Sequence, residues 1–196
     1  MKQRNRRIKL DGQMKQQKQQ PAEVGLSEQL DTLMLHSQYA AAIKLLRRNA
    51  GEAKKDWHLI WNWGWCYFQL EQYQTAKVHF RRVTRLAPDH MLGYWAYGVT
   101  CYKTQNYRAA EIALRKALTL KDNYLARFVL ATTYLLAGKI DKAEQVHLEG
   151  IALKPDSPKR HHAYADFLYD VGRKKEERQE RKKARELTRL QKQVSS

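Results

Sequence analysis

Cysteine and histidine, the side chains that most often act as nucleophiles or metal ligands, are sparse in this sequence of 196 residues. Cys66 and Cys101 are the two cysteines, and neither belongs to a Cys-x-x-Cys pair or to a Cys/His cluster with metal-ligand spacing. His161 and His162 are adjacent, and on a helix they point to different faces, with Asp166 as the nearest carboxylate to His162. A metal site needs more ligands, so we interpret the two histidines as polar residues at the edge of a binding groove and expect no metal.

The patterns that indicate catalysis are also absent from the sequence. No serine or cysteine lies on a strained turn after a strand, no paired carboxylates face each other at a predictable distance, and there is no glycine-rich phosphate loop. We therefore expect no catalytic residues, no cofactor and no enzymatic activity. We expect non-covalent recognition instead. The chain contains 5 Trp, 11 Tyr and 4 Phe, and Trp and Tyr are the residue types that often dominate binding surfaces.

The elements that position these side chains are predicted to be helices. Only 9 Gly and 4 Pro interrupt a chain that is 43% hydrophobic, which favours long helices over many short strands. The longest apolar stretch, residues 57–70, contains three polar residues and is too short to span a bilayer. The basic start of the chain is not followed by the apolar run of a secretory signal. The sequence predicts an all-α, cytoplasmic protein with no transmembrane segment.

Small residues recur along the chain at an almost constant spacing. Ala42, Ala76, Ala110 and Ala143 follow one another at intervals of about 34 residues. Around the second alanine, residues 57–90 contain these five in order: Gly64, Tyr67, Ala76, Phe80 and Pro88. This set and its spacing resemble the tetratricopeptide repeat. The next two segments are weaker copies that keep Gly98, Ala110 and Ala117, and then Tyr134, Ala143 and Pro155.

The resemblance implies a solenoid of helical hairpins, with about four repeats and a C-terminal capping helix. The expected repeats are residues 23–56, 57–90, 91–123, 124–157 and a partial one at 158–172. Two antiparallel helices that cross closely need a small residue at the crossing, which is the role expected of Gly64, Gly98 and Ala131. Larger residues such as Phe80 and Leu114 fill the space between hairpins, at roughly 1.5 to 3 kcal/mol per buried side chain.

In tetratricopeptide repeat proteins the first helix of each hairpin lines a concave groove. Carried onto this sequence, that spacing gives the following partner-binding residues: His58, Trp61, Trp65, Phe68, Trp95, Val99, Tyr102 and Phe128. Exposed aromatic strips often mark binding surfaces, although aromatic residues at helical spacing also form cores, and the basic tail or a second copy could cover these. The Lys and Asn residues that grip acidic heat-shock tails are absent, because Trp61 and Trp65 occupy two of their positions.

Much of the formal charge of +17 is concentrated near the two ends of the chain. Residues 1–22 are rich in Gln, Lys and Arg with little to bury, so they are expected to form a disordered basic arm. Residues 173–196 are expected to form a basic helix or tail, with Glu and Lys/Arg at three- and four-residue spacing. These ends either solubilise the array or bind a polyanion such as nucleic acid or an anionic membrane.

We therefore expect residues 23–172 to form a tetratricopeptide repeat domain that binds another protein or peptide segment in an apolar groove, as an adaptor or chaperone. The alternative is an accessory protein that associates with nucleic acid or an anionic membrane through its basic tails. The partner and the oligomeric state do not follow from the sequence.

Overall fold

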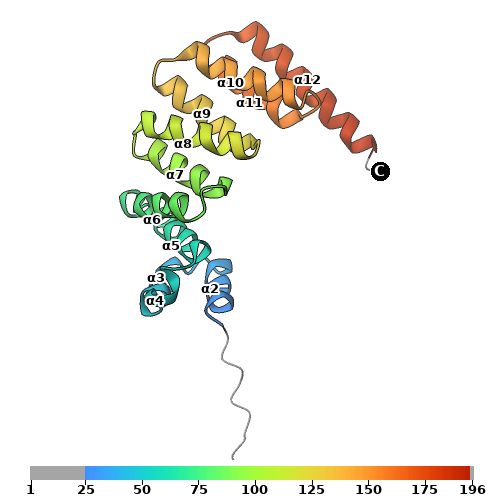
Figure 1. The fold of residues 1–196 in the computed structure, drawn as a ribbon. Coiled ribbons are helices and arrows are strands. Elements are labelled where there is room, and N and C mark those ends of the chain that lie inside the picture. The colour runs from blue at the N-terminus through green and yellow to red at the C-terminus, as the bar shows by residue number, and fades with distance from the viewer. Residues whose placement is uncertain (1–24, 195–196) are drawn as a thin grey trace, which may run out of the picture.

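A computed structural model of the chain describes residues 25–194, which form 11 helices and no strand (Figure 1). The all-α prediction is confirmed. The predicted basic arm, residues 1–22, lies outside the described residues.

Ten of the helices pair into five hairpins, and each hairpin has a first and a second helix. In chain order the pairs are α2 (Leu26–Leu35) with α3 (Tyr39–Arg48), α5 (Trp57–Gln69) with α6 (Tyr73–Leu86), α7 (Met91–Lys103) with α8 (Tyr107–Leu120), α9 (Tyr124–Leu136) with α10 (Ile140–Leu153), and α11 (Pro158–Asp170) with α12 (Lys174–Val194). The remaining helix, α4 (Ala50–Ala53), is a single turn between the first two pairs.

The hairpins stack in sequence order because the second helix of each one packs against the first helix of the next. Thus α3 contacts α5, α6 contacts α7, α8 contacts α9 and α10 contacts α11. The result is the curved array in Figure 1, a solenoid in which each hairpin contacts its neighbours. The predicted helical-hairpin solenoid is confirmed.

Every turn within a hairpin has the same backbone conformation. The middle residue of each three-residue turn adopts a left-handed φ between 56° and 81°. These residues are Ser37, Glu71, Gln105, Gly138 and Gly172. The last two are glycines, for which this conformation carries no steric penalty. The first three carry side chains, which disfavour it.

Close helix crossings explain two of the glycines inside the helices. A Cβ atom on Gly64 would lie 2.9 Å from the ring of Phe80, and one on Gly98 would lie 2.7 Å from the side chain of Leu114. Since real Cβ atoms do not approach other atoms this closely, each glycine is needed for its two helices to pack. The predicted role of both glycines at the crossings is confirmed.

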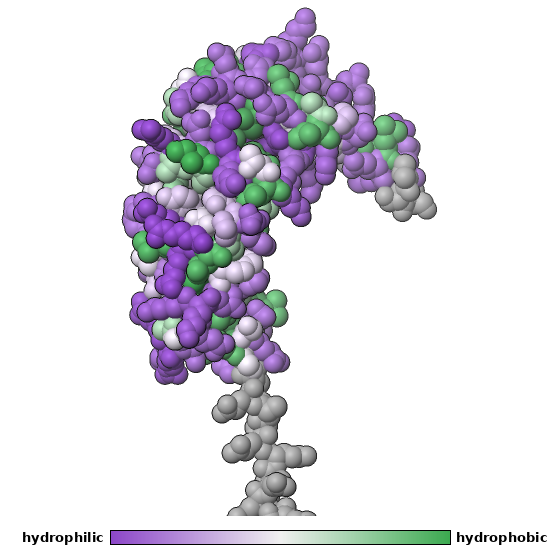
Figure 2. Space-filling view, in the orientation of Figure 1, coloured by the Kyte–Doolittle hydropathy of each residue, from purple (hydrophilic) through white to green (hydrophobic). Residues whose placement is uncertain are grey.

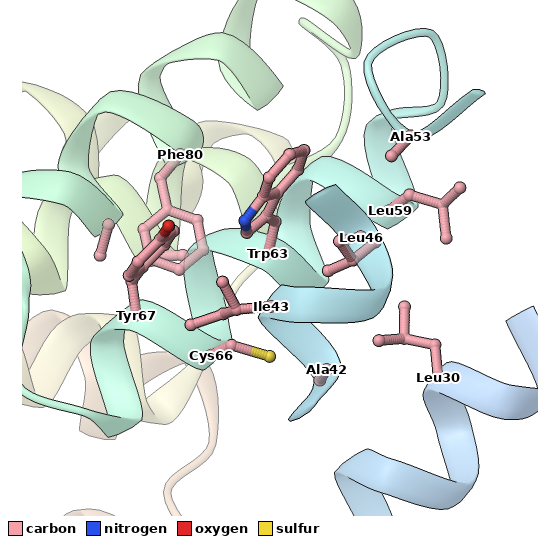
Figure 3. Close-up of a cluster of buried hydrophobic side chains, with 12 residues drawn as sticks. Leu30, Ala42, Ile43, Leu46, Ala53, Leu59, Trp63, Cys66, Tyr67 and Phe80 are labelled. Carbon is pink, nitrogen blue, oxygen red and sulfur yellow. The ribbon is translucent and has the colours of Figure 1, made fainter. Parts of the chain in front are cut away.

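The core is continuous through the first hairpins, as Figure 3 shows. Ile43 and Leu46 of α3 point toward Trp63 and Tyr67 of α5. Phe80 of α6 is fully buried behind Tyr67. Each of these side chains contributes roughly 1.5 to 3 kcal/mol by burial, so a hairpin gains most of its stability from its neighbours.

The C-terminal helix α12 packs along α11 and completes the fifth hairpin (Figure 1). The expected boundary at residue 173 therefore falls at the turn inside this hairpin. Among the described side chains of α12, the only fully buried apolar one is Ala184, and polar contacts such as His161 with Glu180 and Asp166 with Arg181 also join α12 to α11. One of them involves His161, which has no solvent exposure, so its interpretation as a residue at the groove edge is wrong.

No helix among residues 25–194 combines the length and the apolar composition needed to cross a membrane.

Candidate protein-binding surface on the first helices

The first helices of the three central hairpins, α5, α7 and α9, carry almost no charge. Their sequences contain no Asp or Glu, and their only charged residues are Lys103 and Arg127. Lys103 is the last residue of α7, and Arg127 is paired with Asp122 at 2.6 Å and with Glu149 at 3.4 Å. The exposed faces of these helices are therefore built from aromatic, aliphatic and uncharged polar side chains.

Side-chain caps fix where two of these helices begin. The Asp56 carboxylate accepts a hydrogen bond of 2.8 Å from the backbone N–H of His58, at the start of α5. The Asn123 side chain accepts one of 3.0 Å from the backbone N–H of Ala126, at the start of α9. Caps of this kind stabilise a helix by about 1 kcal/mol and favour its start at the residue after the cap.

Four of the predicted residues, Trp61, Trp65, Phe68 and Trp95, lie together and form what we call the aromatic cluster. Trp65 is at its centre, with ring centroids 5.4 Å from Trp61, 5.5 Å from Phe68 and 6.3 Å from Trp95. The first two pairs are nearly parallel, with interplanar angles of 7° and 10°. Because Trp95 comes from α7, the cluster joins two hairpins.

All four members of the aromatic cluster are half-buried and pack against the core on one side. The indole Nε1 atoms of Trp61 and Trp95 are buried without a hydrogen-bond partner in the described residues. Buried indole N–H groups usually have an acceptor, and leaving one unpaired costs about 1–3 kcal/mol. The rings of the aromatic cluster thus lie at the surface, while the N–H groups of Trp61 and Trp95 are buried without an acceptor in the described residues.

The other four predicted residues are placed differently. Val99 and Tyr102 of α7 are half-buried, and Phe128 of α9 is 41% exposed. His58 is exposed and stacks on Trp57 at 3.5 Å, at the N-terminal end of α5 rather than in the aromatic cluster.

One residue near this surface was missed by the sequence reasoning. His90 immediately precedes α7, its ring centroid lies 4.3 Å from that of Trp57, and its Nδ1 atom is buried without a partner in the described residues. It lies one repeat after Asp56 and one repeat before Asn123, so it occupies the same repeat position as those two capping residues. Comparing the residues that precede each first helix would have singled it out.

Both cysteines lie in the core of the described part of the chain, residues 25–194. Burial raises the pKa of the Cys66 thiol to about 12 and also raises that of Cys101, so both are protonated at neutral pH. No three His, Cys, Asp or Glu side chains in this part of the chain gather closely enough to hold a metal ion.

Comparison with known families matches two segments of the chain. Residues 57–90 match one model described as a tetratricopeptide repeat, and residues 93–124 match a second model with the same description. These segments include the aromatic cluster. A search of curated proteins finds no match.

Solved structures with a similar fold include several of MamA. A structure of MamA 41-end from Desulfovibrio magneticus RS-1 aligns with a TM-score of 0.72 and 20% identity, covering 85% of this chain and 94% of that one. A MamA structure from AMB-1 aligns with a TM-score of 0.67 and 24% identity, covering 85% of this chain and 99% of that one. At these identities the likeness shows the shared fold.

Proposed function

We propose that this tetratricopeptide repeat protein is a protein-binding scaffold, an adaptor or chaperone, that holds a partner segment against the aromatic cluster and the neighbouring faces of α7 and α9. The observation that carries the proposal is the aromatic cluster itself. It presents stacked, half-buried rings from two hairpins on an uncharged surface. Large, rigid aromatic side chains contribute most of the binding free energy in many protein interfaces.

The composition of this surface defines the kind of segment that fits it. An acidic tail would find no cation on the exposed faces of α5 and α7 except Lys103 at the end of α7. An uncharged segment with apolar side chains would instead cover the accessible faces of the stacked rings. We infer a cytoplasmic location for this binding, since both cysteines are free thiols.

The test is a pull-down at high salt in which the intact chain is compared with the double variant Trp65→Ala, Trp95→Ala. We expect the double variant to lose the captured protein, because truncating interface tryptophans typically costs more than about 2 kcal/mol each. The matched control is Leu148→Ala with Leu153→Ala, two side chains of α10 that are 47% and 57% exposed and belong to a second helix.

Circular dichroism checks that each variant is folded. Since both tryptophans also pack against the core, Trp65→Leu serves as a second variant that keeps apolar volume there. Equal capture by the intact chain and both tryptophan variants would rule out the aromatic cluster as the binding surface.

A second candidate function is association with a polyanion through the basic ends. Helix α12 carries nine Lys or Arg against four Glu, and residues 1–20 carry seven Lys or Arg against one Asp. Electrostatic contacts of this kind weaken steeply as salt rises. Deleting residues 1–20 should therefore reduce association at low salt only, whereas loss of partner capture at high salt would show that these residues also bind the partner.

A further inference from the structure

The second helices of the first three hairpins carry a dibasic pair at the same repeat position. The pairs are Arg47 with Arg48, Arg81 with Arg82, and Arg115 with Lys116, each one repeat length from the next. The fourth hairpin has Leu148 and Glu149 at the equivalent place, so the series stops at α8. Since equivalent residues of a solenoid lie on the same side of the stack, the pairs form one cationic face.

The positive charge of this face is almost unopposed. Helices α3, α6 and α8 contain ten Lys or Arg and one acidic residue, Glu111. That carboxylate is already occupied, because Lys139 lies 3.3 Å from it and Arg115 lies 3.7 Å from it. Within residues 25–194, the ion pairs of the fold do not include Arg48, Arg81 or Arg85.

Some of these cations also have structural contacts. Arg47 donates a hydrogen bond of 2.9 Å to the hydroxyl of Tyr67, and Arg115 donates one of 2.8 Å to the hydroxyl of Tyr134 in the equivalent place. These two arginines therefore link one hairpin to the next. Structural contacts do not explain Arg48, Arg81 and Arg85, which are exposed on the same helices.

Exposed aliphatic side chains accompany the cations. Val78 is 67% exposed and Ile112 is 64% exposed, and they occupy equivalent positions in successive repeats. Each precedes its dibasic pair by three and four residues, so it lies on the same face of its helix as the pair. Figure 2 shows strongly hydrophilic side chains, in dark purple, at the left of the stack near the level of α6 and α8, with green hydrophobic ones beside them.

We propose that this face of α3, α6 and α8 binds an anionic phospholipid membrane at its surface. The arginines contact lipid phosphates, for which the planar guanidinium is well suited, and Val78 and Ile112 enter the boundary between headgroups and acyl chains. The aliphatic pair favours a membrane over nucleic acid, because a phosphodiester backbone offers no apolar region to receive it. Binding is peripheral, since no described helix is suited to span the bilayer.

This site is separate from the proposed protein-binding surface. The aromatic cluster belongs to the first helices α5 and α7, whereas the cationic face belongs to second helices. The two surfaces can therefore be occupied together, and a failure of one proposal would leave the other unaffected.

Co-sedimentation of the full chain with vesicles tests the proposal. The vesicles contain phosphatidylglycerol and phosphatidylcholine, or phosphatidylcholine alone. The triple variant Arg48→Gln, Arg81→Gln, Arg85→Gln should bind the anionic vesicles roughly 100-fold more weakly, at about 1 kcal/mol for each basic residue near an anionic surface. The matched control, Lys103→Gln, Lys154→Gln, Lys159→Gln, removes the same charge from exposed positions outside both the cationic face and α12, and should lose only a few-fold.

A second variant separates a membrane from a nucleic acid. Val78→Ser with Ile112→Ser keeps every charge and should weaken vesicle binding about tenfold, since two aliphatic side chains no longer enter the interface. Its affinity for a single-stranded oligonucleotide should not change. The proposal is wrong if the serine variant binds vesicles like the intact chain, if the triple variant and its control lose equally, or if the intact chain prefers phosphatidylcholine alone.

Discussion

The Nδ1 atom of His161 in α11 lies 2.6 Å from the Oε2 atom of Glu180 in α12. The other ring nitrogen, Nε2, lies 2.8 Å from the carbonyl oxygen of Pro155. Each ring nitrogen of the buried imidazole therefore lies within hydrogen-bond distance of an oxygen, and the two contacts join α11 to α12 and to the residues that precede α11.

Replacing His161 by alanine should loosen the C-terminal helix. The change removes the hydrogen-bond partner of the Glu180 carboxylate and of the Pro155 carbonyl and leaves a cavity, which is expected to cost about 2–4 kcal/mol. Amide hydrogen exchange should speed up along α12 while α5 and α6 stay protected. His162→Ala, which alters the adjacent half-buried histidine, is the control. Equal protection of α12 in both variants would mean that other contacts hold this helix.

Adding a methyl group at Gly98 should destabilise the third hairpin. The Cβ atom of Gly98→Ala would lie 2.7 Å from Cγ of Leu114 and 3.3 Å from its backbone nitrogen, so the helices must move apart. Overpacking of this kind costs about 1–3 kcal/mol, measurable by urea denaturation. At Gly51 a Cβ would meet nothing within 4 Å, and Gly51→Ala should be neutral or slightly stabilising. A neutral result at Gly98 would show that the crossing is not tight.

Stability should fall as the pH is lowered from about 6.5 toward 4. Burial lowers the pKa of His79 to about 4, helped by the positive charge of Arg82. Burial also lowers the pKa of His147 to about 4, against a smaller opposing effect of Asp166 and Glu144. Both rings stay neutral in the folded chain at a pH where the unfolded chain protonates them, so the folded state loses stability through this window.

The size of the effect is on the order of 1–3 kcal/mol for each histidine. It is measured as the difference in unfolding free energy between pH 7 and pH 4.5, with the intact chain compared to His147→Gln. The variant should depend less on pH than the intact chain. An identical pH dependence would show that His147 does not contribute.

In the turns within the hairpins, replacing a side chain by glycine and replacing glycine by a side chain should change stability in opposite directions. Glu71 has a φ of 58°, which a side chain disfavours, so Glu71→Gly should stabilise the chain by about 0.5–1 kcal/mol. Gly138 has a φ of 72°, so Gly138→Ala should destabilise it by about 1 kcal/mol although the site is open. Thermal unfolding of both variants checks the signs. A stabilising alanine would show that the turn changes conformation.

The solenoid could be predicted from the sequence because its packing depends on small residues at fixed spacing. Gly64 and Gly98 mark crossings where a larger side chain does not fit, and the series of buried alanines gives the repeat length, so both are visible without a structure. The left-handed conformation of the turns could be predicted from the sequence in only some of the hairpins. Gly138 and Gly172 indicate a left-handed residue, whereas Ser37, Glu71 and Gln105 adopt the same conformation without a glycine.

The attachment of α12 could not be predicted from hydrophobic spacing, because polar side chains hold it. Arg173 lies 2.6 Å from Glu144 of α10, and His161 contacts Glu180. A sequence shows that such residues are present but not which of them meet. For the same reason, periodicity indicated that Trp61 and Trp65 share a face of α5, while the approach of Trp95 to Trp65 depends on how two hairpins stack.

The repeated left-handed turn residue divides the solenoid into exchangeable stretches of one repeat length. The stretch from one such residue to the next, for example from Glu71 to Gln105, contains one second helix and the following first helix, and both of its ends have the same backbone conformation. A copy of this stretch could be spliced in at Gln105 without altering the conformation of either neighbouring turn. Duplication at these turn residues would therefore lengthen the solenoid. It would add new binding surface and leave the original ends unchanged.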